Sequence, residues 1–350
     1  MEVGLFEALA RIRGRRVLVL GDVIADVYLE GRITRISREA PVPILEYTGE
    51  TLVLGGAGNA AANVQSLGGR AVLAGIAGDD APGTAARALA RRRGIDVSGF
   101  LLEQGLWSCT KTRILAGSEH TVRQQMLRVD RLPDRAPGRG ILARLENFLA
   151  AAVADAEALV LSDYGLGILP VPLYRAAMRD AAGAGRAVIV DSRHRMLELP
   201  GATLYTPNTA EAEEALGRRF RDEEDLIRAG AELLERLEAR GLLITRGPDG
   251  MTLFVQGGGV THIPAANRLE VFDVCGAGDT VVAGMALGLA AGLGLLDAAF
   301  LANCAAGAAV RRMGTAAVGA EELISAIGLE LVETEEAPER RALAEERRLV

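Results

Sequence analysis

Asp273-Val274-Cys275-Gly276-Ala277-Gly278-Asp279-Thr280 is the stretch that decides the fold, because it joins a glycine-rich turn to an apolar segment over residues 281–295. Glycines on both sides of Ala277 allow a tight turn, and the apolar segment predicts a helix whose first N–H groups can bind an anion. Asp279 falls in the first turn of that helix. Phosphoryl transfer needs such donors beside a carboxylate that accepts a hydroxyl proton. A glycine-rich loop entering a core helix has the same local pattern, so the stretch alone leaves both readings open.

Composition and charge exclude several classes of protein. The chain has 350 residues, of which 49% are hydrophobic and 24% charged, so it can bury a large core as one α/β domain or two smaller ones. A net charge of −7 gives no electrostatic basis for binding nucleic acid or an anionic membrane. Acids at Glu2 and Glu7 do not fit a secretory signal, and no apolar span suits a membrane helix. A cytoplasmic location is expected.

The cysteines do not indicate a metal site. Cys109, Cys275 and Cys304 lie far apart, and the chain has three histidines, so no zinc site is expected. Cys275 lies beside the glycines, but no histidine is near it in sequence to activate a thiolate. We therefore interpret it as a small residue that fills a tight turn rather than as a nucleophile.

Short apolar runs alternate with helical patterns along the chain. The predicted strands are residues 17–20, 71–76, 158–161, 187–190 and 242–245. The predicted helices are residues 59–67, 81–93, 142–154, 172–182, 211–216 and 223–240. Repeated β–α units of this kind predict a doubly wound, mostly parallel α/β sheet.

Two β-rich segments interrupt the alternation and predict extra strands that project from the main sheet. They cover about residues 27–53 and 100–129 and are inserted in one domain over residues 1–328, while residues 329–350 form a charged tail. Long projecting strands leave edges that the same strands of a second chain can cover, so a homodimer through these strands is expected.

A second glycine-rich turn lies near the N-terminus. In Gly55-Gly56-Ala57-Gly58-Asn59-Ala60-Ala61-Ala62-Asn63 the turn precedes a helix of small residues, where backbone and amides can approach a polyol. Asn59 and Asn63 are one turn apart and could face one ligand, although one of them could instead cap the helix. Asp22 and Asp26 follow the first strand, at the edge where parallel sheets bind ligands.

Both glycine-rich motifs resemble the two signatures of the ribokinase-like (PfkB) carbohydrate kinases. The first runs from Gly55 to Gly78 and the second from Asp273 to Gly284. The stretch Thr206-Pro207-Asn208-Thr209-Ala210-Glu211 is similar to the family's N-x-x-E motif, and Thr245-Arg246-Gly247 to its T-x-G strand end. The resemblance implies the ribokinase-like fold with a β-rich lid, and an ATP-dependent sugar kinase.

One branch of the family is most similar, the heptose-7-phosphate kinase half of the bifunctional protein of ADP-heptose synthesis. The most specific likeness is Arg35-Ile36-Ser37-Arg38-Glu39-Ala40-Pro41-Val42-Pro43. No H-x-G-H motif occurs, so no nucleotidyltransferase activity is expected. Leu166 and Arg193 stand where this branch has lysines. Arg193 keeps the positive charge with a different geometry, whereas Leu166 cannot.

The resemblance implies a role for each matched residue. Asp279 would be the base, with the N–H groups of Gly276, Ala277 and Gly278 holding the phosphoryl charge. The expected sugar-phosphate residues are Asp26, Gly55, Gly56, Asn59, Asn63, Lys111 and Arg113, with Arg35 as a further candidate. The expected ATP residues are Asn208, Arg193, Thr245, Gly247 and Asn303. Glu211 would hold Mg²⁺ through water, and a monovalent cation is left open.

Alternative functions remain at this point. Another sugar or sugar-phosphate kinase of the family is the nearest, and a nucleoside or vitamin kinase fits the lid string less well. A noncatalytic sugar-phosphate sensor would also keep the fold. A Rossmann dehydrogenase would need its glycine fingerprint after the first strand, where this chain has Gly21-Asp22-Val23.

Overall fold

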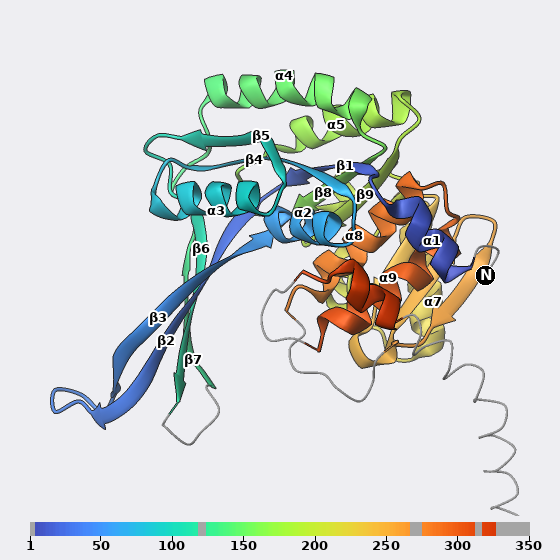
Figure 1. Ribbon diagram of the computed structural model, residues 1–350. Coiled ribbons are helices and arrows are strands. Elements are labelled where there is room, and N and C mark those ends of the chain that lie inside the picture. The colour runs from blue at the N-terminus through green and yellow to red at the C-terminus, as the bar shows by residue number, and fades with distance from the viewer. Residues whose placement is uncertain (1–3, 118–123, 267–274, 312–316, 327–350) are drawn as a thin grey trace, which may run out of the picture.

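The fold is built on a nine-stranded sheet (Figure 1). The computed structural model describes residues 4–117, 124–266, 275–311 and 317–326. In spatial order the strands are β13 (Gly259–Ile263), β12 (Met251–Val255), β11 (Gly241–Thr245), β10 (Leu204–Tyr205), β9 (Ala187–Ser192), β8 (Ala158–Asp163), β1 (Arg16–Gly21), β4 (Arg70–Gly78) and β5 (Asp96–Glu103). From β11 to β5 all neighbours are parallel, and β12 and β13 add an antiparallel edge.

Helices cover both faces of this sheet, because its central strands are apolar on both sides. In β1, Val17 and Val19 belong to one buried cluster and Leu18 and Leu20 to the other, as strand alternation requires. The first face carries α1 (Leu5–Ile12), α2 (Ala57–Ser66), α3 (Ala81–Arg92), α8 (Ala277–Ala290) and α9 (Leu295–Ala309). The second carries α4 (Arg139–Asp155), α5 (Val171–Gly183), α6 (Thr209–Leu216) and α7 (Glu223–Arg236).

A second sheet projects from the body as a lid (Figure 1). Its strands, in spatial order, are β3 (Pro43–Gly56), β2 (Val23–Ile36), β6 (Cys109–Gly117) and β7 (Gln124–Arg131). The pairs β2–β3 and β6–β7 are antiparallel, and β2–β6 is parallel. The roots of β2 and β3 continue into the body, so residues on them lie near the carboxyl end of β1 in the large sheet.

The fold class predicted from the sequence is confirmed, and so are the five strands and six helices, with ends that differ by a few residues. One boundary was wrong: residues 100–103 belong to β5 of the main sheet, because Phe100 is fully buried against β4, so the second lid segment starts at β6. The strands β10, β12 and β13 were not predicted. The predicted tail over residues 329–350 lies outside the described residues.

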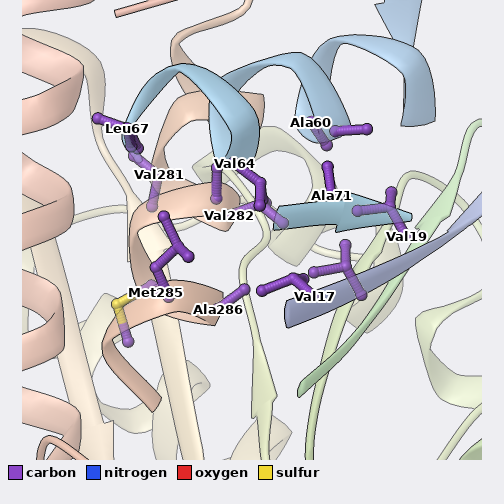
Figure 2. Packing of buried hydrophobic residues seen from close by; sticks show 14 of the residues in the cluster. Val17, Val19, Ala60, Val64, Leu67, Ala71, Val281, Val282, Met285 and Ala286 are labelled. Atoms are coloured by element: carbon purple, nitrogen blue, oxygen red, sulfur yellow. The ribbon is translucent and has the colours of Figure 1, made fainter. Parts of the chain in front are cut away.

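Helix α8 is buried on every side in the centre of the first face. Figure 2 shows Val281, Val282, Met285 and Ala286 of α8 in one cluster with side chains of α2, β1 and β4. On its other side α8 packs closely on α9, because a Cβ at Gly284 would lie 2.8 Å from the backbone Cα of Ala302. The position of the first turn of α8 is therefore set by apolar packing on several elements at once.

We expect Gly284→Ala to lower the free energy of unfolding by about 1–3 kcal/mol, because the added methyl group must push α8 and α9 apart. Urea unfolding followed by circular dichroism measures the change. Gly140→Ala in α4 is the matched control, since nothing lies within 4 Å of a Cβ there. An unchanged stability in Gly284→Ala would show that the two helices can separate at little cost.

Candidate active site

The candidate site lies at the point where the strand order of the large sheet reverses. From β1 the chain first adds β4 and β5 on one side, and then β8 and β9 on the other. β1 lies between β8 and β4, and ligands of open α/β sheets bind at the carboxyl ends of strands on either side of such a reversal. The polar residues Asp22, Asp163 and Asp191 lie at the ends of β1, β8 and β9. The N-terminus of α8 and the root of the lid meet the sheet at the same edge.

Asp279 is the central group of the site, in the first turn of α8 and 5% exposed. Asn59 Nδ2 donates a hydrogen bond to its Oδ2 at 2.7 Å, and the hydroxyl of Tyr164 donates to its Oδ1 at 3.1 Å. Burial raises the pKa of Asp279 from 3.8 to about 6, although both hydrogen bonds and the charge of Arg193 oppose that rise. A carboxylate with such a pKa is ionised at neutral pH and still able to take a proton.

Asn63 lies behind Asn59 and is fully buried. Its Nδ2 donates to the carbonyl oxygen of Asn59 at 3.0 Å, and its Oδ1 accepts from the hydroxyl of Thr280 at 3.1 Å. These contacts tie α2 to α8. The structure thus places Asn59 in contact with the acid and gives Asn63, which was expected to face a ligand, a supporting role.

Asp26 lies at the root of the lid on β2 and is 4% exposed. Arg113 of β6 donates to its Oδ1 at 2.5 Å. A Cβ at Gly55 would lie 2.2 Å from Asp26 Oδ2, so a glycine is needed for the carboxylate to lie against β3. Gly56 has a φ of +57°, which only glycine adopts easily. It is the last residue of β3 and directly precedes α2. The structure therefore brings the predicted residues Asp26, Gly55 and Gly56 together at the root of the lid. The guanidinium of Arg113 is bound by the Asp26 carboxylate.

The basic lid residues lie at two different depths. Lys111 pairs with Asp26 across β6 and β2, and burial followed by the charge of Arg193 lowers the pKa of its amine. Arg35 lies nine residues beyond Asp26 on β2, which at 3.3 Å per residue is about 30 Å farther out. Lys111 thus faces the site, and Arg35 does not reach it within the same chain.

The expected anion-binding turn directly precedes α8. Gly276 is the residue before the helix and has a φ of +80°, in the left-handed region that favours glycine. Ala277 and Gly278 begin the helix, where N–H groups have no intrahelical acceptor. Asp273 and Val274 of the sequence motif lie outside the described residues.

A cavity of about 380 Å³ opens on the other side of this turn, a size typical of small-molecule sites. Four of the expected nucleotide residues line it, together with Ala277 and Gly278: Asn208, Thr245, Gly247 and Asn303. Most other lining side chains are apolar, including Met251, Val281 and Val310. Asn303 Nδ2 donates to the carbonyl oxygen of Pro264 at 2.9 Å, which fixes one wall. A flat, largely apolar ring fits such a cavity.

Glu211 and Asn208 form the N-terminal cap of α6. The Asn208 side chain accepts from the Glu211 N–H, and Glu211 Oε2 accepts from the Asn208 N–H, both at 2.9 Å. Burial raises the pKa of Glu211. Among the described residues no group of three or more His, Cys, Asp or Glu is arranged to hold a metal ion. A cation here would need ligands from elsewhere, such as nucleotide phosphates.

Arg193 lies apart from the cavity lining, on the loop after β9. Its guanidinium carbon is 4.2 Å from the centre of the Tyr164 ring. Its positive charge acts on three carboxyl groups, those of Asp191, Glu211 and Asp279. The pKa of Asp191 is raised well above its usual value, first by burial and then by Asp279. Arg193 is therefore the cation between the predicted base and the predicted metal residue.

Sequence reasoning missed two residues of the site, Tyr164 and Asp191. Tyr164 directly follows β8, and Asp191 is the last residue but one of β9, so the rule that ligands bind at the carboxyl ends of strands could have found them. Leu166, which stands where a lysine was expected, is half-buried against the second face of the sheet and donates its N–H to Asp22 Oδ2 at 3.3 Å. It adds no charge to the site.

Comparison with known proteins shows the family. Residues 15–322 match the model of the pfkB family carbohydrate kinase, so the chain belongs to the pfkB family of carbohydrate kinases. The family resemblance carried by the two glycine-rich motifs is confirmed. No helix in the described part of the chain has both the length and the apolar character needed to cross a membrane.

Several curated relatives are similar over most of the chain. The Bifunctional protein HldE of Geobacter metallireducens is 42% identical over 322 residues, which are 92% of this chain and 64% of that protein. The Bifunctional protein HldE of Caulobacter sp. strain K31 is 46% identical over 313 residues, 89% of this chain and 62% of that protein. The chain thus spans less than two thirds of the length of these relatives.

Solved structures share the fold at low sequence identity. Arabidopsis thaliana ribokinase, complexed with ribose and ATP, has a TM-score of 0.69 at 18% identity and covers 90% of this chain and 99% of its own. The tetrameric inhibited form of Escherichia coli phosphofructokinase-2 has a TM-score of 0.73 at 19% identity, with 91% and 99% covered. These similarities establish the ribokinase-like fold.

We expect Asp279→Asn to stabilise the protein above pH 6 by about 1–3 kcal/mol, because burial makes the ionised carboxylate costly. With a folded pKa near 6 and an ordinary value of 3.8, that cost is absent below pH 4, grows between pH 4 and 6, and is complete above pH 6. Chemical unfolding at pH 4, 5, 6 and 7.5 measures it. A gain that is equal at every pH would contradict the raised pKa.

Proposed function

We propose that the chain transfers the γ-phosphoryl group of ATP to a hydroxyl group of a sugar phosphate. The observation that carries this proposal is the position of Asp279, whose carboxylate lies between the sugar-side groups Asn59 and Asp26 and the turn that borders the cavity. An acceptor on one side and a nucleotide on the other would meet at this carboxylate.

The proposed reaction uses Asp279 as the general base. The acceptor oxygen attacks the γ-phosphorus, the bond to the ADP oxygen breaks, and the hydroxyl proton passes to Asp279. The N–H groups of Gly276, Ala277 and Gly278 would hold the charge on the transferred group, which favours the transition state over the bound substrates. Hydrogen bonds from Asn59 and Tyr164 hold the two oxygens of this carboxylate in place, and each oxygen keeps a further lone pair that can accept the proton.

The sugar would lie at the root of the lid. Asp26 and Asn59 offer an acceptor and an amide, and Gly55 and Gly56 keep the backbone accessible. Lys111 is the candidate ligand for the substrate phosphate. Arg113 would act through Asp26, because its guanidinium is already bound to that carboxylate.

The nucleotide would lie in the cavity, with its base against the apolar lining and its phosphates at the N-terminus of α8. Glu211 and Asn208 fit Mg²⁺ held through water. The cap uses Oε2 of Glu211, which leaves Oε1, and hard oxygen ligands are those that Mg²⁺ takes. Mg²⁺ would neutralise charge on the phosphates. An enzyme that uses ATP in this way is proposed to act in the cytoplasm.

D-glycero-β-D-manno-heptose 7-phosphate is the acceptor that we propose, with the 1,7-bisphosphate as product. The lid string from Arg35 to Pro43 resembles the heptose branch, and the similar relatives carry the name Bifunctional protein HldE. Because the chain spans less than two thirds of those relatives, only the kinase reaction is proposed.

An ADP-release assay with ATP and Mg²⁺ tests this function on the heptose 7-phosphate, the same heptose without its phosphate, fructose 6-phosphate and ribose. We expect turnover with the heptose phosphate alone. Asp279→Asn should lower kcat by about 10²–10⁴-fold, because it cannot accept the proton. The matched control, Asp155→Asn on the surface of α4, should leave kcat unchanged.

Activity with another sugar would retain the kinase and discard the heptose. Tight binding of sugar phosphate without turnover would instead favour the noncatalytic sensor. The two results separate the reaction from the choice of acceptor.

The same function is proposed for a homodimer formed through the lid. Exposed apolar side chains gather on the lid strands and the loop between β2 and β3: Ile36, Val42, Tyr47, Met126, Leu127 and Val129. Two of the four lid strands, β3 and β7, are edges with unpaired backbone groups. A second lid would cover both the apolar side chains and the edges.

We expect Leu127→Lys with Val129→Lys to shift the protein from dimer to monomer, because the two side chains lie two residues apart on one face of β7. Sedimentation velocity over a concentration series measures the mass. Ile227→Lys on α7 is the control for adding charge at an exposed apolar residue. A monomeric mass of the unaltered protein at every concentration would refute the dimer.

A further inference from the structure

We propose that Tyr164 is a positioning residue of this site, which orients the Asp279 carboxylate through its hydroxyl and holds Arg193 and Lys111 against its ring. This inference rests on the proposed function. It adds a residue to the proposed site, because Tyr164 lies outside both glycine-rich motifs.

The hydroxyl of Tyr164 completes the contacts of the base. It donates to Asp279 Oδ1 at 3.1 Å, while Asn59 donates to Oδ2 at 2.7 Å, so each carboxylate oxygen has one fixed donor. The rotation of the carboxylate is thereby restricted from both sides. One donor comes from the loop after β8 and the other from α2, so two separate elements hold the carboxylate.

Two buried carboxylates hold the backbone of this loop. Asp22 is 1% exposed, and its Oδ2 accepts from the N–H groups of Tyr164 at 2.9 Å and Leu166 at 3.3 Å. Asp163 is fully buried, accepts from the N–H of Gly165 at 3.1 Å and is bound by Arg195. Side chains anchored in this way are placed with little freedom. The loop is therefore built to present Tyr164.

The Tyr164 ring brings two cations together. The guanidinium carbon of Arg193 lies 4.2 Å from the ring centre, and Lys111 Nζ lies 5.1 Å from it. Arg193 follows β9 and Lys111 is on β6 of the lid, so the ring joins the body to the lid. Like charges repel, and burial followed by the charge of Arg193 lowers the pKa of Lys111. The electron-rich ring offsets part of that repulsion where phosphate charge would gather.

The charged groups that act on Asp279 come from several elements. Arg193, after β9, favours the ionised carboxylate, while Asp26 on β2 disfavours it. Asp191, near the end of β9, has its own pKa raised by burial and then by Asp279. Lys111 on β6 lies on the same tyrosine ring. The Tyr164 hydroxyl favours the ionised form, and its own pKa is raised well above its usual value by burial and by Asp279. It therefore stays protonated and remains a donor throughout the working range of pH.

Tyr164→Phe keeps the ring and its cations and removes the donor. The carboxylate then loses a favourable contact, so the acid limb of the pH profile of kcat/KM should move upward by about one pH unit, and kcat/KM at pH 6 should fall several-fold. KM for ATP should stay within about twofold. Tyr164→Leu removes the ring as well and should raise KM for the sugar phosphate by about threefold.

Tyr174→Phe is the matched control. Tyr174 lies on α5 and is fully buried, and its hydroxyl has no hydrogen-bond partner among the described residues. Its pH profile should match that of the unaltered protein. An unshifted acid limb in Tyr164→Phe, or an equal shift in Tyr174→Phe, overturns the proposal.

A readout without substrate separates this inference from the proposed function. The rise in Tm that Asp279→Asn gives at pH 7.5 should be larger by about 1–2 °C in the Tyr164→Phe background, because the buried carboxylate has lost a donor there. At pH 4 the two rises should be equal. A larger rise at pH 7.5 supports the contact even if no sugar phosphate is turned over, and equal rises at both pH values overturn it.

Discussion

The burial of α8 is the constraint on which the site depends. This helix packs on α2 and α9 and on the sheet, so its first turn has a fixed place, and that turn carries an acid. A carboxylate in such surroundings is costly to ionise, and the raised pKa of Asp279 measures that cost. Hydrogen bonds from Asn59 and Tyr164 to the two carboxylate oxygens offset part of this cost of ionisation. Stability is lost at this carboxylate, and its pKa is one that suits the proposed general base.

Much of the architecture could be predicted from the sequence, because local signals and tertiary packing agree. The apolar run of β1 is buried on both faces, as a central parallel strand requires, and the glycine-rich turn before α8 has the left-handed residue that its pattern demands. The boundary of the lid was harder. Residues 100–103 and the lid strands have the same β-rich composition, and only pairing with β4 assigns those residues to the main sheet.

The contacts within the site could not be predicted, since they join residues far apart in the chain. Tyr164 and Asp279 are separated by 115 positions, and Arg113 and Asp26 by 87. Sequence patterns supplied residue types for the sugar side but not their partners. Asn63 illustrates the limit: its spacing from Asn59 fitted a shared ligand, whereas complete burial assigns its amide to the protein. Polar residues in a helix of small residues can serve either role, and burial decides between them.

Lys111 is the single lysine in the chain, and it lies on the ring of Tyr164 at the root of the lid. Amine-directed acylation therefore has one side-chain target in this chain. The lowered pKa of that amine leaves more of it uncharged, which is the form that reacts. A bound anion would shield it. The extent of acylation at Lys111 thus reports directly whether an anion is bound at the site, because no other lysine in the chain contributes to the signal.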